Sequence, residues 1–181
     1  MENLKRINRT LIAKGSIIDY YKDEIETVDG NRALWDHIEH KGAAAMLAIM
    51  DDGKIVLVRQ YRNSLDKAIL EIPAGGIEPG EDTGAAAKRE LEEETGYKAG
   101  KVEHLLDINT TVAFCNEKIY VYKATNLTKG ETHLDRDEYV DVECYSLEEI
   151  IKMVETGEIT DSKTISTIMY YATTISNEKK C

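Results

Sequence analysis

The stretch ILEIPAGGIEPGEDTGAAAKRELEEETGYKAG, residues 69–100, joins a glycine-rich turn to a run of carboxylates. Residues 83–95 consist mainly of Ala, Lys, Arg, Leu and Glu, which favour a helix. Asp82 stands in the position of an N-cap, and Gly96 in that of the residue that ends a helix. Because the apolar residues before Pro73 predict a strand, the predicted order is strand, glycine-rich loop and acidic helix.

The acidic helix concentrates negative charge on one face. Glu90, Glu93 and Glu94 lie three and four positions apart, and like charges at these spacings weaken a helix by roughly a few tenths of a kcal/mol per pair. Arg89 is the nearby cation, and it can reach Glu93 one turn later. Two explanations fit such a face: an exposed, solvated helix, or a site for a hard divalent cation such as Mg²⁺, which binds carboxylate, water and phosphate oxygens.

The loop GGIEPGE before the helix favours the metal site. Gly75 and Gly76 follow the predicted strand, and glycine supplies backbone angles that other residues rarely adopt. We expect the loop to fold through such angles and to bring its backbone close to the same metal. The sequence therefore predicts a site that holds metal and phosphate together.

The pattern GX₅EX₇RELXEEXG runs from Gly75 to Gly96 and resembles the Nudix box at every fixed position. Tyr97 follows it, where that family usually has an aliphatic residue. The resemblance implies an α+β fold, the Nudix α/β/α sandwich with a mixed sheet. It also implies hydrolysis, dependent on Mg²⁺ or Mn²⁺, of a nucleoside diphosphate linked to another group.

The same resemblance assigns roles around the helix. Glu90 and Glu94 are implied as the main metal ligands, and Ala74 as a further ligand through its carbonyl oxygen. Glu93 is implied as a catalytic residue that either binds the metal or supports its ligands, and Arg89 as a structural residue. Such a set suits a diphosphate, because metals neutralise phosphate oxygens and lower the pKa of bound water.

Most of the remaining chain resembles the ADP-ribose pyrophosphatase branch of this family. The resemblance rests on the segments HKGAAAMLAI, VRQYRN, LEIPAGGIEPGE and NEKIYVYKA, followed by an acidic loop and SLEEI. In that branch an N-terminal antiparallel sheet takes part in dimer formation, and both subunits build the active site. We therefore expect a homodimer, with strands for dimerisation in residues 1–40 that belong to the same unit as a hydrolase domain in residues 41–181.

The branch also implies three substrate-binding residues. Arg62 matches an arginine that contacts the phosphates of the substrate, and Glu117 matches a glutamate that contacts substrate. Lys41 stands where a relative has an arginine. Each of these roles is carried over by resemblance, one position at a time.

The acidic loop HLDRDEY is expected to supply the catalytic base. Glu138 matches the corresponding region of the branch, and Asp135 and Asp137 are the alternatives within the loop. A mobile acidic loop that closes over substrate is a familiar gating device.

One segment departs from the branch. Members specific for ADP-ribose usually carry a proline and a glycine where TVAF has Val112 and Ala113. The sequence therefore leaves other nucleotide sugars open. Trp35, Tyr20 or Tyr21 could stack on a base, but a core or interface role is the more common one for such aromatic residues.

The rest of the chain predicts a mixture of strands and helices. Strands are expected in the first 40 residues, with a hairpin at Asp29-Gly30, and in residues 43–50 and 55–63, whose apolar runs suggest burial on both faces. Further strands are expected within 102–109, 118–127 and 138–146, and helices within 147–157 and 162–176. An α+β or α/β/α architecture follows.

Composition excludes several other classes. A net charge of −11 and a pI of about 4.9 argue against nucleic acid as a partner, which calls for a basic surface. No apolar run reaches the roughly 18–20 residues of a membrane span, and the N-terminus lacks the features of a secretory signal, so a cytoplasmic protein is expected. Three cysteines without a CxxC pair and four scattered histidines indicate neither a disulfide framework nor a zinc site.

Three functions remain. The first is hydrolysis of ADP-ribose or a related nucleotide sugar, giving AMP and ribose 5-phosphate from ADP-ribose. The second is a hydrolase of the GDP-mannose type or of broader nucleotide-sugar specificity. The third is a sensor that binds such a ligand without turnover, which is disfavoured because the carboxylates of the box are intact.

Overall fold

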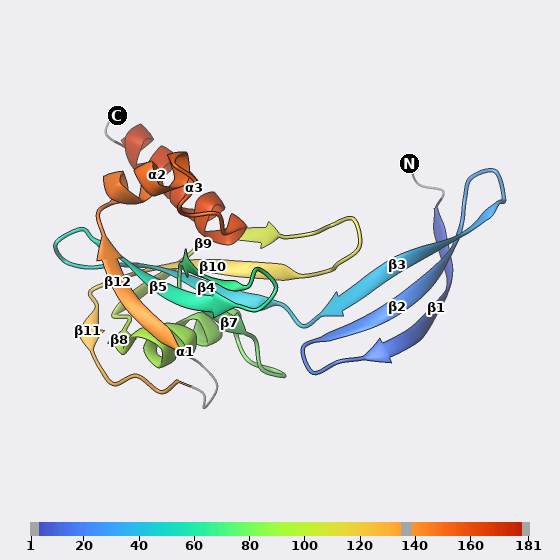
Figure 1. Cartoon of the computed structure of the whole chain (residues 1–181), viewed down its shortest axis with the longest axis horizontal. Coiled ribbons are helices and arrows are strands. Elements are labelled where there is room, and N and C mark those ends of the chain that lie inside the picture. Colours follow the sequence, from blue (N-terminus) through green and yellow to red (C-terminus); the bar gives the residue numbers. More distant parts are fainter. Residues whose placement is uncertain (1–3, 135–138, 179–181) are drawn as a thin grey trace. The chain divides into compact units, whose positions relative to one another are not determined.

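The computed structural model describes residues 4–134 and 139–178, which form two compact units. The first contains the N-terminal segment to Gly42 together with Asn109–Lys118, and the second contains Ala43–Ile108 and the chain from Ile119 onward. Figure 1 labels the elements of both units.

The second unit is built on a mixed sheet, for which the described residues give seven strands. Five of them follow the order β12-β5-β4-β10-β9, while β6 pairs with β5 and β7 with β4. β10 runs parallel to β4, whereas β5 is antiparallel to β4, β6 and β12. The bounds are β4 Ala43–Ile49, β5 Ile55–Arg62, β6 Lys67–Glu71, β7 Ala74–Gly76, β9 Lys101–Asn109, β10 Lys118–Thr125 and β12 Val140–Tyr145.

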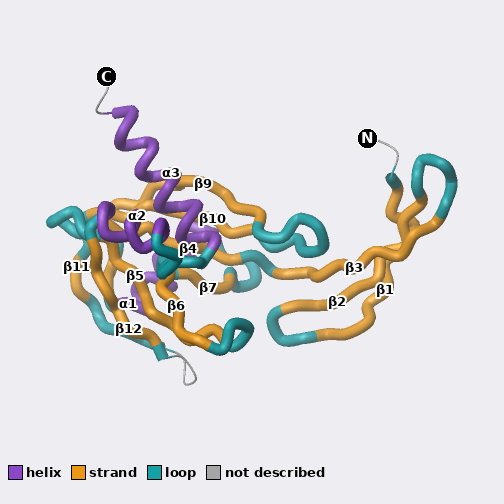
Figure 2. Tube along the Cα trace, turned by 45° about the horizontal axis from the view of Figure 1, so that its top comes forward, coloured by secondary structure: helices purple, strands orange, loops and turns teal. Residues whose placement is uncertain are grey.

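Helices cover both faces of this sheet. Side chains alternate between the faces along a strand, and in β4 Ala44, Met46 and Ala48 pack with α1 (Thr83–Thr95). Leu47 packs on the opposite side in a second core cluster, with α2 (Leu147–Glu155) and α3 (Ser162–Glu178). Figures 1 and 2 show α1 on one side of the sheet and α2 and α3 on the other. The expected α/β/α sandwich with a mixed sheet is therefore confirmed, as is the burial of the central strands on both faces.

Local signals set the ends of α1. The Asp82 side chain accepts hydrogen bonds from the backbone N–H groups of Gly84 and Ala85, which would otherwise lack partners at the start of the helix. Gly96 ends the helix in the left-handed region, with φ of 69°. The helix predicted over residues 83–95 has the bounds found in the structure.

The strands before α1 differ from the single strand that was predicted. β6 ends at Glu71 and β7 begins at Ala74, so that Pro73 separates two short strands that pair with different neighbours. Proline cannot donate to a sheet ladder, which explains the interruption. A small sheet of β8 (Tyr97–Lys98) and β11 (Thr128–Lys129), which the sequence pattern missed, follows the helix.

The first unit contains the expected N-terminal antiparallel sheet. Its order is β1-β2-β3, with β1 Lys5–Lys14, β2 Ile18–Glu26 and β3 Arg32–His40. Gly30 has φ of 76° in the β2–β3 turn, which confirms the predicted hairpin.

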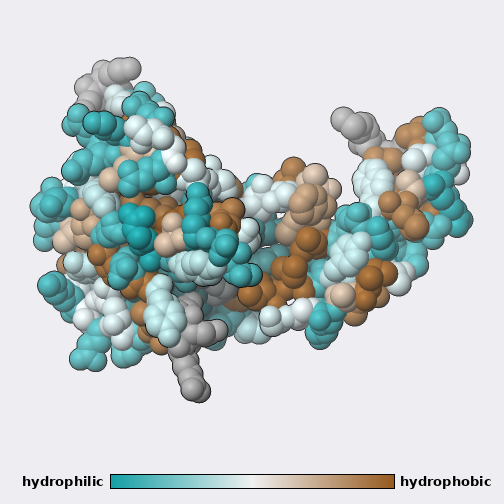
Figure 3. Space-filling view, viewed as in Figure 1, coloured by the Kyte–Doolittle hydropathy of each residue, from teal (hydrophilic) through white to brown (hydrophobic). Residues whose placement is uncertain are grey.

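Apolar side chains are exposed on this sheet. They include Ile7, Leu11, Ile12, Leu34 and Trp35, and Figure 3 shows brown, hydrophobic surface over the N-terminal strands. Exposed apolar groups of this kind often mark an interaction surface. The expected part of residues 1–40 in dimerisation stays a prediction.

No helix within the described residues is both long enough and apolar enough to cross a membrane.

Candidate active site

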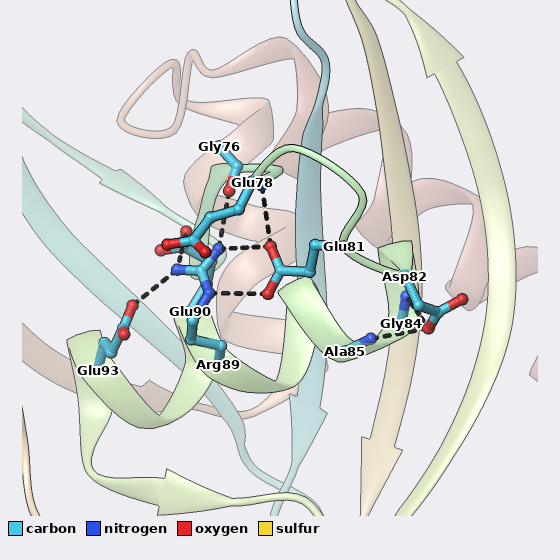
Figure 4. Close-up of polar contacts among 9 residues, drawn as sticks. All are labelled: Gly76, Glu78, Glu81, Asp82, Gly84, Ala85, Arg89, Glu90 and Glu93. Carbon is cyan, nitrogen blue, oxygen red and sulfur yellow. Dashed lines mark hydrogen bonds and ion pairs between the residues drawn. The ribbon is translucent and has the colours of Figure 1, made fainter.

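Arg89 lies at the centre of a group of carboxylates beside the loop before α1 (Figure 4). Its Nε and Nη2 atoms donate to the two carboxylate oxygens of Glu81, at 2.9 and 3.0 Å. Its Nη1 atom donates to Glu90 at 2.7 Å and to Glu93 at 2.9 Å. We call Glu81, Arg89, Glu90 and Glu93 the α1 cluster, and it contains three carboxylates for one guanidinium.

Arg89 also fixes the loop itself. Nη2 donates to the backbone carbonyl of Gly76 at 2.8 Å, so one side chain ties the start of the loop to Glu81 at its end and to the helix. The hydrogen bonds from Arg89 hold the pKa of Glu81 below its ordinary value, with a further contribution from the backbone N–H of Glu78. The structural role implied for Arg89 agrees with these contacts.

The expected unusual backbone angle is found at one glycine of the loop and not at the two that begin it. Gly75 and Gly76 lie in β7 with ordinary backbone angles, whereas the left-handed residue of the loop is Gly80, with φ of 82°. A Cβ atom on Gly75 would lie 2.2 Å from the carboxyl group of Glu90. Gly75 is therefore required for the close approach of Glu90 and not for an unusual φ.

Glu94 lies apart from the α1 cluster on the buried side of the helix. It is 3% exposed, and its Oε2 atom accepts a hydrogen bond of 3.1 Å from the backbone N–H of Ala74. The contact joins the helix to the strand end just before Gly75. Ala74 was expected to act through its carbonyl, and this contact uses its amide; the metal role of the carbonyl stays a prediction.

The donor chemistry of the helix fits a hard divalent cation. Glu90, Glu93 and Glu94 offer carboxylate oxygens, the ligands that Mg²⁺ and Mn²⁺ take in proteins. Within the described residues, no group of three or more His, Cys, Asp or Glu side chains converges as a ready-made metal site. One oxygen of Glu90 and one of Glu93 accept hydrogen bonds from Arg89, so a metal bound by these residues would share their carboxylates with that guanidinium.

Arg62 belongs to a second, more deeply buried group. Its Nε and Nη2 atoms donate to the two carboxylate oxygens of Glu71 at 2.6 and 2.7 Å. Lys163 Nζ forms an ion pair with the same carboxylate and lies 3.1 Å from Asp161 Oδ2. We call Arg62, Glu71, Asp161 and Lys163 the α3 cluster, because Lys163 comes from α3 and Asp161 directly precedes that helix.

Burial and charge oppose each other at Glu71. The residue is 1% exposed, and burial raises the pKa of its carboxyl group. The hydrogen bonds and charges of Arg62 and Lys163 outweigh burial, so that the pKa of Glu71 is lowered overall. Glu71 is therefore a buried carboxylate that is kept ionised by two cations.

Glu94 of α1 lies close enough to Arg62 of the α3 cluster to interact with it. The pKa of Arg62 is raised, mainly by the hydrogen bonds to Glu71, and the charge of Glu94 adds to the effect. The structure thus brings Arg62 near the helix that carries the predicted metal ligands. Its predicted contact with substrate phosphates stays a prediction.

Two other predicted residues belong to the first unit and are described within it. Lys41 is exposed. Glu117 accepts a hydrogen bond of 2.6 Å from Thr110 Oγ1, and its Oε1 atom lies 3.7 Å from His40 Nε2. The roles of Lys41 and Glu117 in substrate binding stay predictions.

The first unit also contains a hollow of about 510 Å³, whose lining includes Tyr20, Trp35 and Phe114. Phe114 comes from the TVAF segment, where the amides of Phe114 and Cys115 both donate to the carbonyl of Thr111. Val112 is 79% exposed at this turn. Trp35 and Tyr20 were named from the sequence, whereas Phe114 was missed. Phe114 lies near them because β3 pairs with residues 114–116.

The predicted catalytic base lies outside the described residues. Glu138 and its alternatives Asp135 and Asp137 all fall in the undescribed segment, so their roles stay predictions.

Comparisons with known proteins agree with this geometry. A model of the NUDIX domain matches residues 39–167. The chain is 40% identical over 168 residues to the ADP-ribose pyrophosphatase of Bacillus subtilis (strain 168), which covers 92% of this chain and 91% of that protein. It is also 40% identical over 168 residues to the methanol dehydrogenase activator of Bacillus methanolicus, with the same shares covered.

A solved structure described as an ADP compounds hydrolase has a similar fold. It aligns with a TM-score of 0.88 over 100% of this chain and 98% of that chain, at 20% sequence identity. At this identity the likeness concerns the fold, including the N-terminal sheet.

Proposed function

Because the chain belongs to the Nudix family, we propose that it hydrolyses the pyrophosphate bond of ADP-ribose or a related nucleoside diphosphate sugar. ADP-ribose would give AMP and ribose 5-phosphate. The family, and with it the prediction of a Nudix pyrophosphohydrolase, is confirmed by the NUDIX match and by the identity to a pyrophosphatase over most of the chain. The choice of substrate is the proposal.

The observation that carries the proposal is the different charge balance of the two clusters. The α1 cluster has more carboxylates than cations, as a cation site requires. In the α3 cluster two cations balance two carboxylates, and Arg62 is half-exposed. A metal-bound diphosphate combines a cation with an anion. The excess carboxylates of the α1 cluster suit the cation, and the partly exposed guanidinium of Arg62 suits the phosphate oxygens.

Glu90, Glu93 and Glu94 would hold Mg²⁺ or Mn²⁺, with the carbonyl of Ala74 as a further ligand. A bound metal supplies neutralisation of the phosphate oxygens and a lowered pKa for the attacking water. Arg89 orients Glu90 and Glu93 through its Nη1 atom.

Binding of the substrate falls to other residues. Arg62 would contact the diphosphate, since guanidinium groups bind phosphate oxygens through paired hydrogen bonds. Lys41 and Glu117 would contact other parts of the substrate. Glu138 would accept the proton of the attacking water, with Asp135 or Asp137 as its alternatives.

We also propose a homodimer in the cytoplasm, formed through residues 1–40. The apolar side chains exposed on β1 and β3 support an interface there, because such groups are usually covered in solution. Sedimentation velocity tests this proposal. A monomer at micromolar concentration would contradict it.

The function is tested by turnover of ADP-ribose, GDP-mannose, UDP-glucose, NADH and diadenosine polyphosphates, each with Mg²⁺, with Mn²⁺ and with a chelator. Preference for ADP-ribose, lost on chelation, is the expected result. Preference for GDP-mannose would support the alternative specificity and direct attention to Val112 in the TVAF turn. Binding without any turnover would contradict the proposal and favour a sensor.

A further inference from the structure

Lys163 occupies a position that local physical chemistry disfavours. It is the second residue of α3, where the helix dipole repels cations, and it is only 7% exposed. A buried ammonium group must recover its lost hydration through its partners. The functions assigned above make no use of this residue, so its placement calls for an explanation.

The partners of Lys163 connect α3 to the strand end before the active-site loop. Lys163 shares the Glu71 carboxylate with Arg62 and lies 3.1 Å from Asp161. The next residue, Thr164, accepts a hydrogen bond of 2.9 Å from the backbone N–H of Ile72. Two residues further on, Ala74 is held by Glu94. The segment 71–74 is thus tied to α3 on one face of the sheet and to α1 on the other.

Asp161 also caps the start of α3. Its Oδ2 atom accepts hydrogen bonds from the backbone N–H of Thr164 at 2.9 Å and from the Thr164 hydroxyl at 2.6 Å. These contacts cap the first turn of α3 in the way an N-cap residue does. Asn caps a helix about as well as Asp, so the charge of Asp161 can be removed while the cap is kept.

Stability alone does not account for the buried ion pair. Replacing a buried pair with well-packed apolar residues is often neutral or stabilising, so an apolar contact could anchor α3 on β6 at least as well. An apolar contact would not, however, reproduce the effect of Lys163 on Arg62. Without Lys163, the whole negative charge of Glu71 would act on the guanidinium of Arg62.

The hydrogen bonds of Arg62 leave room for a ligand. Its contacts to Glu71 use Nε and one N–H of Nη2, and a guanidinium has five N–H donors. Glu71 therefore orients one edge of the group. The negative charges of Glu71, Glu94 and Asp161 act on Arg62, and Lys163 offsets part of the charge of Glu71, so that more of the charge of Arg62 is left for an anion.

We propose that Lys163 is a positioning residue for substrate binding: by sharing the Glu71 carboxylate, it leaves Arg62 both oriented and electrostatically free to bind the diphosphate of a nucleotide. This inference rests on the proposed function, because it takes a nucleoside diphosphate as the ligand of Arg62. In this inference Lys163, Glu71 and Asp161 together set the charge that acts on Arg62.

The test compares Lys163→Met, Arg62→Met and the double variant in the full-length protein. The affinity for α,β-methylene ADP-ribose, which resists hydrolysis, is measured by calorimetry, and kcat and KM are measured with ADP-ribose. We expect Lys163→Met to raise Kd and KM about tenfold with little change in kcat, as for the loss of one favourable charge interaction. We expect Arg62→Met to raise Kd by more, and the double variant to equal Arg62→Met alone.

Lys123→Met is the matched control. Lys123 lies in β10 of the same unit and forms a 3.0 Å ion pair with Glu103 near the surface. Its substitution is expected to leave Kd within about twofold of the wild type. If Lys163→Met behaves like this control, or if its effect multiplies with that of Arg62→Met, Lys163 does not act through Arg62 and the proposal is overturned.

Asp161→Asn is expected to tighten binding where Lys163→Met weakens it. It therefore also tests the proposal if Lys163→Met fails to fold. The charge of Asp161 acts on both Lys163 and Arg62. Its removal should leave Lys163 more fully paired with Glu71 and tighten analogue binding about threefold. A defect in folding or packing would weaken binding instead, so weaker or unchanged binding by this variant contradicts the proposal.

The same measurements separate this inference from the proposed function. A wild-type protein that binds the analogue through Arg62 and Lys163 but hydrolyses no member of the substrate panel would contradict the enzyme and leave the inference standing. If the wild-type protein hydrolyses ADP-ribose and Lys163→Met has the same KM, the proposed function stands and the inference is contradicted. A wild-type protein that does not bind the analogue overturns the inference directly.

Discussion

Arg62 and Arg89 each bind a glutamate in the same way and yet belong to groups with a different balance of charge. Each arginine donates through Nε and Nη2 to both carboxylate oxygens of one partner, Glu71 or Glu81. The Nη1 atom of Arg89 also donates to Glu90 and Glu93, so that three carboxylates surround one guanidinium. At Arg62 the carboxylate is shared with Lys163, so cations are not outnumbered. The paired hydrogen bonds are alike, and the difference between the two groups lies in the charges around each arginine: an excess of carboxylates at Arg89, and equal numbers of cations and carboxylates at Arg62.

The largest effect is expected at Glu94, whose charge acts on Arg62 of the α3 cluster. Glu94→Gln removes a charge from the predicted metal ligands while it keeps an oxygen that can accept from Ala74. We expect turnover to fall by about 10³-fold, because metal stabilisation of a transition state is worth several kcal/mol. Steady-state kinetics across a range of Mg²⁺ concentrations measure the loss, and circular dichroism monitors the fold.

Glu92→Gln is the control on the same helix. Glu92 forms a 3.0 Å ion pair with the partly exposed Lys98 and is not among the predicted ligands. Its turnover should remain within about twofold of the wild type, as for a surface pair. Near-normal activity of Glu94→Gln would refute the assignment of Glu94 as a ligand.

The second prediction breaks the α3 cluster. Glu71→Gln leaves Arg62 and Lys163 without their shared carboxylate, and removing one partner of a buried ion pair costs about 3 kcal/mol of unfolding free energy. Urea denaturation measures the loss.

Glu143→Gln is the matched control for that substitution, because Arg59 grips Glu143 through the same two nitrogens but nearer to solvent. It should cost less than about 1 kcal/mol. Equal losses for the two variants would show that burial does not distinguish the pairs.

The third prediction tests whether Gly75 is needed for the space it leaves or for its backbone conformation. Gly75→Ala places a Cβ atom where the Glu90 carboxyl group lies, so that this flexible side chain must move. We expect activity to fall about 10- to 100-fold, with a higher Mg²⁺ requirement, because the position of a ligand changes. Stability should change little, since the end of the Glu90 side chain can shift.

Gly76→Ala is the neighbouring control. A Cβ atom on Gly76 has no heavy atom within 4 Å, and its φ is not left-handed. Activity should remain within about twofold of the wild type, and stability can even rise slightly. A loss at Gly76 equal to that at Gly75 would contradict the proposed close approach.

The smallest effect concerns pH. The pKa of Glu71 and of Glu81 is lowered in the folded protein, so each carboxylate adds stability that is present above the unfolded pKa, about 4.3 for Glu. That contribution is lost as the pH falls through the lower, folded value.

The free energy of unfolding should therefore decline below about pH 4.5. Glu81→Gln should flatten this decline by less than about 1 kcal/mol, since Glu81 lies near the surface. Urea midpoints between pH 7 and pH 3 provide the measurement. A decline in Glu81→Gln that runs parallel to the wild type would show that the Arg89 pair adds nothing.

Much of the fold follows from local signals that can be read along the chain. The bounds of α1 are set by Asp82 and Gly96, and the hairpin of β2 and β3 by Gly30, each through contacts or angles of neighbouring residues. Apolar runs predicted the buried strands because β4 and β5 meet a core on each face. The short strand β7 after Pro73 was missed, because its pairing with β4 is a long-range contact.

The α1 cluster was predictable for the same reason. Glu90 and Glu93 are neighbours of Arg89 on one helix, and a spacing pattern records such contacts directly. The reason for Gly75 was not predictable, because the obstacle is a side chain 15 positions later in the sequence, and only packing brings the two together.

The sequence by itself determined the helix, its carboxylates and the family, because these depend on residues within a few turns of one another. Only the tertiary structure decided that Glu71, 92 positions before Lys163, would share its carboxylate with that lysine and with Arg62. The sequence near Lys163 does not predict such a pair, since its local partner is Asp161 and a cation at the start of a helix is disfavoured by the dipole. The sheet brings the three charges together, and their balance sets the electrostatic potential beside the active-site helix.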